Sequence, residues 1–270
     1  MKIGIFDSGY GGLTILEKIV ERLPQYDYIY LGDNARTPYG TRSFEVVYDF
    51  TLQCVKKLFE LDCQIVILAC NTASAKALRT IQQNDLQRIA PNRRVLGVIR
   101  PTAEHIDDFT ETNIVGLFGT AGTIQSKSYE LEIAKTFPQI SVIAESCPMW
   151  VPLIENNFHN TNGADFFIKY HIDNILERNK NIDAIILGCT HYPLLIDKIK
   201  KYLPENIKII TQGNIVAESF ADYLVRHPKH EKLCSKNGIT EFYTTESPEK
   251  FSSSATIFLN KKIEAKKIVV

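Results

Sequence analysis

The chain has 270 residues, which is enough to bury a large hydrophobic core that needs no disulfide bonds or metal ions for stability. Lysine plus arginine and aspartate plus glutamate each number 31, so the formal net charge is zero and the overall charge attracts neither nucleic acid nor an anionic membrane. No apolar run approaches the ~18 residues of a membrane span, and the six scattered cysteines include no C-x-x-C pair. We therefore expect a cytoplasmic globular protein with reduced thiols that binds no nucleic acid and no membrane.

Short apolar strands alternate along the chain with amphipathic stretches of helical period. The expected strands are Ile3–Phe6, Tyr28–Leu31, Ile65–Ala69, Arg94–Val98, Ile114–Phe118, Gln139–Ala144, Ala184–Leu187 and Lys208–Ile210. This alternation predicts an α/β fold with mainly parallel sheets and helices on both faces.

Near the C-terminus, Ser247 and Pro248 have the residue types of a helix start. The residues from Ile263 to Val270 mix lysine with apolar side chains and are a candidate closing edge strand.

Two apolar runs end in a small residue, a cysteine and then an amide or hydroxyl residue. They are residues 64–72, QIVILACNT, and residues 183–191, DAIILGCTH. Each predicts a buried strand followed by a helix, which places Cys70 and Cys189 at the carboxyl edge of a sheet, where open α/β folds bind ligands. A helix N-terminus also favours the thiolate form. An isolated cysteine after a strand is more often inert, but the repeated context favours a function for both and predicts two sheets.

Asp7 and Ser8 follow the first strand and precede a glycine-rich turn at residues 9–12. The carboxylate is a candidate proton partner for a thiol or a site for an ammonium group, whereas Ser8 and the backbone amides of the turn suit an anion. The alternative is a purely structural capping pair. The turn matches neither the dinucleotide fingerprint nor the P-loop.

Glu155 and His191 are further acid–base candidates. Glu155 ends the apolar stretch CPMWVPLIE, and burial there would raise the pKa of its carboxyl group; an exposed helical glutamate is the alternative. His191 lies two residues after Cys189 and is placed to exchange a proton with it. These two side chains also suit zinc, although no second ligand pair at metal spacing accompanies them. The remaining histidines are expected at the surface: His105, His159, His171, His227 and His230.

Two further loops follow predicted strands. Asp33 and Arg36 are expected to form an ion pair that braces the first loop rather than a catalytic pair. Residues 119–123, GTAGT, offer hydroxyls and amides that suit an anion. The candidate groups therefore share one location, the ends of strands.

Taken together, these motifs resemble those of glutamate racemases in the aspartate/glutamate racemase superfamily. The matching segments follow the family's order: Phe6–Gly9, Gly32–Arg36, Pro38–Gly40, Ala69–Ser74, Gly97–Ile99, Gly119–Thr120, Val151–Glu155 and Gly188–Leu194. The two cysteine segments are specific to the superfamily, whereas Asp7 and Pro38–Gly40 indicate its glutamate branch.

The resemblance implies two pseudo-symmetric α/β domains, each a mainly parallel sheet flanked by helices, with the active site between them. Domain one would comprise residues 1–97 plus 211–270 and carry Asp7 and Cys70. Domain two would comprise residues 98–210 and carry Glu155, Cys189 and His191. Similar proteins are commonly homodimers.

The resemblance further implies an isomerase without cofactor or metal that interconverts L- and D-glutamate and supplies D-glutamate for peptidoglycan. Cys70 and Cys189 would be the two bases, with Asp7 assisting the first and Glu155 and His191 the second. The implied substrate-binding residues are Ser8, Pro38, Tyr39, Gly40, Asn71, Thr72, Thr120, Thr123 and Thr190.

Two alternatives remain at this point: a racemase for another amino acid such as aspartate, and an amino-acid-binding protein without catalysis. The chain also departs from the family's usual residues in two loops. Arg100, Pro101 and Thr102 stand where the family often has an acidic or neutral residue and then Pro-Gly, and Thr211, Gln212 and Gly213 replace a more usual Asp-Ser-Gly.

Overall fold

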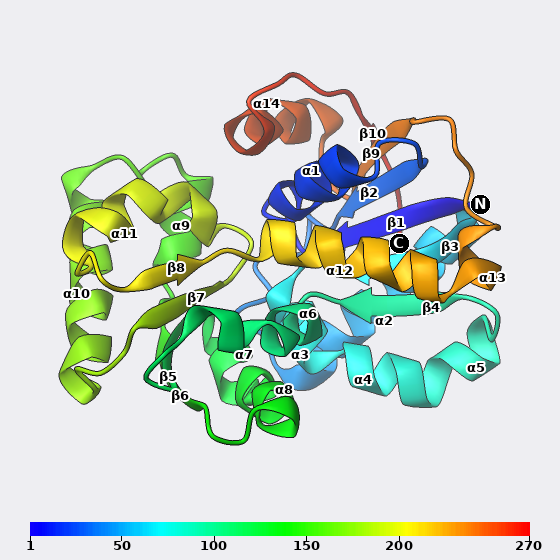
Figure 1. The fold of residues 1–270 in the computed structure, drawn as a ribbon. Helices are drawn as coiled ribbons and strands as arrows, with labels where there is room; N and C mark the ends of the chain where they lie inside the picture. Colours follow the sequence, from blue (N-terminus) through cyan, green and yellow to red (C-terminus); the bar gives the residue numbers. More distant parts are fainter.

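The computed structural model describes residues 1–270 and contains two β-sheets flanked by helices (Figure 1). The six-stranded sheet has the order β10-β9-β2-β1-β3-β4, and the four-stranded sheet has the order β6-β5-β7-β8. The strands are β1 (Lys2–Asp7), β2 (Tyr28–Gly32), β3 (Cys63–Leu68), β4 (Arg94–Gly97), β5 (Ile114–Gly119), β6 (Ser141–Ser146), β7 (Ala184–Gly188), β8 (Lys208–Ile210), β9 (Thr240–Thr244) and β10 (Ala265–Lys267).

All strand pairs are parallel, and the second sheet repeats the strand order of the first. The order β2-β1-β3-β4 matches β6-β5-β7-β8, so β3 and β7 hold equivalent positions. The predicted α/β fold with two parallel sheets is therefore confirmed.

Helices connect the strands and cover both sheets. They are α1 (Leu13–Arg22), α2 (Phe44–Glu60), α3 (Asn71–Lys76), α4 (Leu78–Thr80), η1 (Ile81–Asp85), α5 (Leu86–Ile89), α6 (Ile99–Glu104), η2 (Ile106–Phe109), α7 (Ala121–Ser126), α8 (Ser128–Thr136), α9 (Trp150–Glu155), α10 (Asn162–Arg178), η3 (Tyr192–Leu195), α11 (Ile196–Tyr202), α12 (Gln212–Arg226), α13 (Pro228–Glu231) and α14 (Pro248–Leu259). No helix is both long enough and apolar enough to cross a membrane.

The eight strands expected from the sequence are all present, with shifted ends. The largest shift is in β6, which begins at Ser141 and continues to Ser146 instead of ending at Ala144. The predicted start of the last helix is confirmed, because Ser247 Oγ accepts a hydrogen bond from Lys250 N at 3.2 Å. The candidate C-terminal strand is also present as β10 at the edge of the first sheet.

The sequence did not predict β9, which lies between β2 and β10. Its residues, TEFYT, are mostly half-buried rather than buried, so the strand lacks the apolar run that marks its neighbours. Tertiary pairing with β2 therefore decides its conformation more than its own side chains do.

Helix α12 carries the chain from the second sheet back to the first (Figure 1). It packs against α1, and both helices contribute to a hydrophobic core that also includes Ile5 of β1 and Leu187 of β7. The two sheets therefore share buried contacts.

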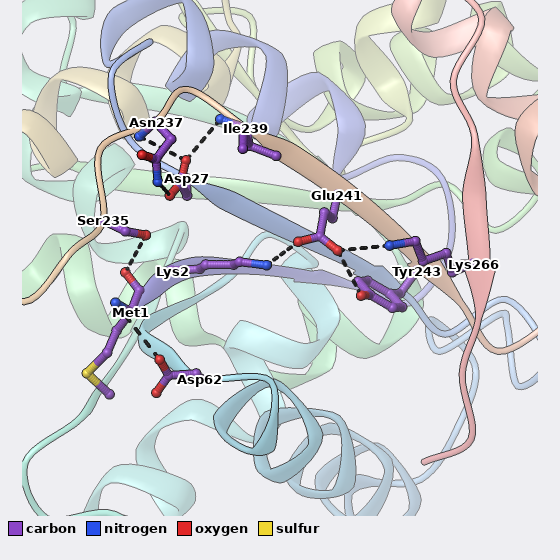
Figure 2. Close-up of polar contacts among 10 residues, drawn as sticks. All are labelled: Met1, Lys2, Asp27, Asp62, Ser235, Asn237, Ile239, Glu241, Tyr243 and Lys266. Atoms are coloured by element: carbon purple, nitrogen blue, oxygen red, sulfur yellow. Dashed lines mark hydrogen bonds and ion pairs between the residues drawn. The ribbon is translucent and has the colours of Figure 1, made fainter.

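Polar contacts attach the C-terminal part of the chain to the start of β1 and to Asp27, just before β2 (Figure 2). The Asp27 carboxylate accepts hydrogen bonds from Asn237 N, Asn237 Nδ2 and Ile239 N at 3.1, 2.6 and 3.0 Å. Lys2 pairs with Glu241 of β9, and Lys266 of β10 bonds the same carboxylate at 3.1 Å. These contacts hold β9 and β10 in the first sheet.

Candidate active site

Cys70 and Cys189 line the same cavity from the carboxyl edges of two different sheets. Cys70 comes after β3 and is the N-cap residue of α3, whereas Cys189 directly follows β7. Because β3 and β7 occupy equivalent places in the repeated strand order, each sheet brings its thiol to this space by the same topology. All six cysteines are free and buried.

Loops from both sheets form the cavity walls. The lining residues are Ser8, Thr37, Pro38, Tyr39, Gly40, Thr41, Cys70, Asn71, Thr72, Thr120, Ala121, Cys147, Pro148, Val151, Pro152, Cys189, Thr190 and His191. Every residue that the resemblance implied for substrate binding is among them except Thr123, which is buried and bonds to Thr120 at 3.1 Å.

Cys70 is held in a buried, weakly polar environment. Its Sγ lies 3.4 Å from Ser8 Oγ and accepts a hydrogen bond from Ala73 N at 3.5 Å. Burial raises the pKa of the Cys70 thiol to about 12, and the charge of Asp7 adds to the rise. The N–H of Ala73 at the N-terminus of α3 lowers the pKa of Cys70, as expected of a helix N-terminus, but by less than burial and Asp7 raise it. The desolvation of the sulfur and the nearby carboxylate outweigh the dipole of the short helix α3.

Asp7 is fully buried and contacts the residue that follows the second thiol. Its Oδ1 accepts a hydrogen bond from Gly9 N at 2.8 Å, and its Oδ2 accepts one from Thr190 Oγ1 at 3.2 Å. Burial raises the pKa of Asp7, whereas the nearby His191 opposes the rise. The carboxylate acts on Cys70 through its charge, while Ser8 is the side chain that hydrogen-bonds the sulfur.

His191 connects Cys189 to Glu155 of α9. Its Nδ1 lies 3.9 Å from Cys189 Sγ, and its Nε2 lies 3.0 Å from Glu155 Oε1, so both ring nitrogens have partners. Burial alone would lower the pKa of His191, but the contacts with Cys189 and Glu155 raise it to about 10. The contacts with Cys189 and Glu155 therefore favour the protonated form of the imidazole.

No group of three or more histidine, cysteine, aspartate or glutamate side chains is arranged to hold a metal ion. The pair that suits zinc, Cys189 and His191, is engaged instead in the contact chain that ends at Glu155.

Three threonine hydroxyls from the two sheets form a cluster at the cavity. Thr72 Oγ1 lies 2.9 Å from Thr120 Oγ1, and Thr123 Oγ1 lies within 3.4 Å of both. The backbone also joins the two sides, because Gly122 N donates to Gly40 O at 2.8 Å. Neutral hydroxyls and amides of this kind suit a carboxylate ligand.

The predicted ion pair of Asp33 and Arg36 is confirmed, with Arg36 Nε 2.6 Å from Asp33 Oδ2. The same carboxylate oxygen accepts a hydrogen bond from the Tyr39 hydroxyl at 2.5 Å. Tyr39 is thus anchored through its hydroxyl to Asp33, and the residue lines the cavity wall.

Two residues lie where their sequence context did not predict them: Cys147 lines the cavity, and His171 is buried although it was expected at the surface. Cys147 and Pro148 line the cavity because β6 continues to Ser146, so they follow a strand end that was predicted two residues too early. His171 is buried rather than exposed: its Nδ1 lies 2.7 Å from Glu145 Oε1, and its ring packs edge-on against Trp150. His171 falls on the buried face of α10 with Ala164, Ile168, Ile172 and Ile175, and this helical spacing is the signal that could have placed it.

The chain is similar in sequence and in structure to one family along nearly its whole length. The model of the Asp/Glu/Hydantoin racemase family matches residues 3–219. A curated glutamate racemase from Roseobacter denitrificans is 40% identical over 274 residues, covering 98% of both chains.

Solved structures agree with the sequence comparison. Glutamate racemase isoform RacE1 from Bacillus anthracis superposes with a TM-score of 0.89 at 34% identity, covering 100% of this chain and 97% of that one. Glutamate racemase from Francisella tularensis, solved in complex with D-glutamate, gives a TM-score of 0.86 at 34% identity, covering 99% and 97%. On these findings, the chain belongs to the glutamate racemase family of isomerases.

Proposed function

We propose that this chain interconverts L- and D-glutamate, with Cys70 and Cys189 exchanging protons with opposite faces of the substrate α-carbon. The observation that carries the proposal is that two sheets contribute one thiol each to a single cavity. A single base that removes and returns a proton on one face retains configuration. Two bases on opposite faces invert it, with one thiolate accepting the α-proton while the other thiol donates one.

The side chains that surround the two thiols differ, and we assign them different roles. Ser8 hydrogen-bonds Cys70, and the charge of Asp7 makes that sulfur a stronger base once it is ionised. Glu155 holds His191, which keeps a proton beside Cys189. His191 thereby donates a proton to Cys189 or accepts one from it, and Glu155 holds the imidazole in position.

The α-proton of an amino acid is a very weak acid, so the site must stabilise the negative charge that develops as the proton leaves. We propose that Asn71, Thr72 and Thr120 donate hydrogen bonds to the substrate carboxylates, together with Ser8 and the loop Pro38–Gly40. Thr190 would donate through its backbone N–H, because its hydroxyl already donates to Asp7. Donors fixed in a closed cavity of low dielectric stabilise such charge without rearranging during the reaction.

Glutamate is the proposed substrate because the relatives that match this chain over nearly its full length are named glutamate racemases, and the one from Francisella tularensis was solved with D-glutamate. Aspartate is the competing substrate, since the same thiol chemistry serves it.

The wider role follows from the family resemblance and is proposed with it. The product D-glutamate would serve peptidoglycan synthesis in the cytoplasm, and the chain would form a homodimer. Residues 1–97 plus 211–270 would form domain one and residues 98–210 domain two. This division is supported by the strands, since β1–β4, β9 and β10 fall in the first set and β5–β8 in the second.

Circular dichroism of L- and D-glutamate incubated in D₂O tests the function. We expect the optical signal to decay from both enantiomers while deuterium enters the α-carbon, and we expect aspartate to react far more slowly. Cys70→Ala and Cys189→Ala should each abolish racemisation. Cys63→Ala, which removes a buried thiol in β3 outside the cavity, is the matched control and should remain active.

Racemisation that survives in both cavity cysteine variants would overturn the two-base assignment. Binding of glutamate without any loss of optical activity in the wild-type protein would favour the non-catalytic alternative.

A further inference from the structure

Asn71, Gln212 and Tyr129 form a closed ring of side-chain hydrogen bonds directly behind the cavity. Asn71 Nδ2 donates to Gln212 Oε1 at 2.7 Å, Gln212 Nε2 donates to Tyr129 OH at 2.7 Å, and Tyr129 OH donates to Asn71 Oδ1 at 2.6 Å. The exposed fractions of the three residues are 2%, 3% and 0%, respectively. They come from α3, α12 and α8, so the ring joins three separate elements.

The orientation of the ring is set by a backbone carbonyl. Val98 O can only accept, and Gln212 Nε2 donates to it at 3.2 Å, so the amide nitrogen of Gln212 must face Val98. Thr102 agrees with this orientation, because its hydroxyl donates to Val98 O at 3.0 Å and its oxygen lies 3.0 Å from Gln212 Nε2. Val98 O and Thr102 Oγ1 share the one Nε2 hydrogen that does not go to Tyr129. Gln212 Oε1 is left to face Asn71.

This orientation decides which atoms of Asn71 remain for a ligand. Its Oδ1 is occupied by the Tyr129 hydroxyl, and one Nδ2 hydrogen is occupied by Gln212. The second Nδ2 hydrogen has no acceptor in the protein, while Asn71 itself lines the cavity next to Cys70. A rotated Asn71 amide would set two carbonyl oxygens against each other at Gln212, at the cost of two buried hydrogen bonds.

We infer that Gln212 and Tyr129 are positioning residues that hold Asn71 with an N–H donor available to a carboxylate oxygen of the substrate. The inference rests on the proposed function, since the substrate is the glutamate assigned there. Gln212 is the first residue of α12, where the chain leaves the second sheet. The orientation of the Asn71 N–H therefore also depends on the position of α12.

The test is a double-mutant cycle of Tyr129→Phe and Asn71→Ala. Tyr129→Phe keeps the aromatic ring and removes only the hydroxyl, so its effect should appear in KM. We expect KM for glutamate to rise ~10-fold while kcat falls less than ~3-fold, since the misaligned hydrogen bond is lost already in the ground state and its loss is only slightly larger in the transition state. In the Asn71→Ala background, Tyr129→Phe should change KM by less than ~2-fold, because its effect passes through Asn71.

Tyr28→Phe is the matched control. Tyr28 is another buried tyrosine, and its hydroxyl donates to Leu23 O at 2.7 Å outside the cavity. Its variant should lower the melting temperature and leave KM unchanged. Equal KM effects of Tyr129→Phe in both backgrounds would indicate a general structural role and overturn the inference while leaving the proposed function intact.

A measurement independent of activity covers the case in which the proposed function fails. The side-chain amide hydrogens of Asn71 can be identified by NMR from their loss in Asn71→Asp. We expect one of them to exchange slowly with solvent in the wild type and ~10-fold faster in Tyr129→Phe, because the closed ring protects it. Equal exchange rates in the two proteins would overturn the ring as a positioning device, whether or not glutamate is racemised.

Discussion

Thr190 Oγ1 donates a hydrogen bond to Asp7 Oδ2 at 3.2 Å, which joins the residue after one thiol to the carboxylate that influences the other. Asp7 ends the central strand β1, and Thr190 follows β7 of the other sheet. The two halves of the candidate site are therefore in direct polar contact through buried side chains. A change on one side is expected to affect the thiol on the other.

Asp7→Asn should lower kcat by ~100-fold, the scale of general acid–base contributions, because it removes the negative charge that acts on Cys70. The two enantiomers have equal free energy, so kcat/KM must fall equally in both directions. Because Asp7 acts on only one of the two thiols, we expect kcat and the α-deuterium isotope effect to change by different amounts for L-glutamate and for D-glutamate. Equal changes for the two enantiomers would instead assign Asp7 a structural role. Asp183→Asn, which alters a carboxylate bonded to Thr110 and to the amides of residues 111 and 112, is the control.

Glu155→Gln should shift the alkaline limit of kcat to lower pH. The pKa of His191 is about 10, raised above its ordinary 6.5 by its contacts with Cys189 and Glu155 against the effect of burial. The contribution of the protonated ring to folding stability is thus complete below pH 6.5 and is lost as the pH rises through about 10. Removing the charge of Glu155 lowers the pKa of His191, so the ring loses its proton, and kcat falls, at a lower pH.

The measurement is a pH–rate profile of each protein between pH 6 and 11. The matched control is Glu145→Gln, since Glu145 pairs with His171 at 2.7 Å outside the cavity. An alkaline limit that stays in place in Glu155→Gln, or moves equally in the control, would contradict the assigned role.

Gly11→Ala should disrupt the site by steric clash. A Cβ atom at Gly11 would lie 2.3 Å from Thr190 Oγ1 and 2.4 Å from His191 Nδ1. We expect kcat/KM to fall at least ~100-fold, because displacement of catalytic groups by about 1 Å has effects of that size. Gly163→Ala places its Cβ at an ordinary 3.6 Å from Thr161 Oγ1 and is the control, with activity unchanged. Full activity of Gly11→Ala would show that Thr190 and His191 can shift without consequence.

Asp27→Ala should destabilise the fold by ~3 kcal/mol without changing kcat/KM, because three donors lose their buried acceptor. Burial raises the pKa of Asp27, but the nearby Ser235 hydroxyl and the hydrogen bonds from Ile239 and Asn237 outweigh it and lower the value to about 2. The stability from these bonds is therefore present above the ordinary 3.8 and lost as the pH falls through about 2. Urea unfolding at pH 7 and in acid measures both effects. A loss of activity in the folded variant would contradict the separation of this cluster from the site.

The course of the buried strands and the position of the two thiols followed from the sequence alone. Both cysteines end apolar runs, and the alternation of strand and helix leaves little choice but parallel sheets whose carboxyl edges carry the polar residues. The Asp33–Arg36 pair was also predictable, because residues three apart in a loop are brought together by the chain itself. These features depend on local pattern and short separation.

Tertiary structure decided which residues contact one another and in which direction their pKa values shift. The raised pKa of Cys70 follows from its burial beside Asp7, which outweighs the local helix effect that the sequence suggested. The burial of His171, the place of Cys147 on the wall and the ring of Asn71, Gln212 and Tyr129 all involve partners from different elements. Such contacts depend on the packing of segments far apart in the chain, and desolvation is a property of that packing. The sequence by itself therefore determined where the chemical groups lie along the sheets. The folded arrangement determined which side chains contact one another and how burial and nearby charge shift their pKa values.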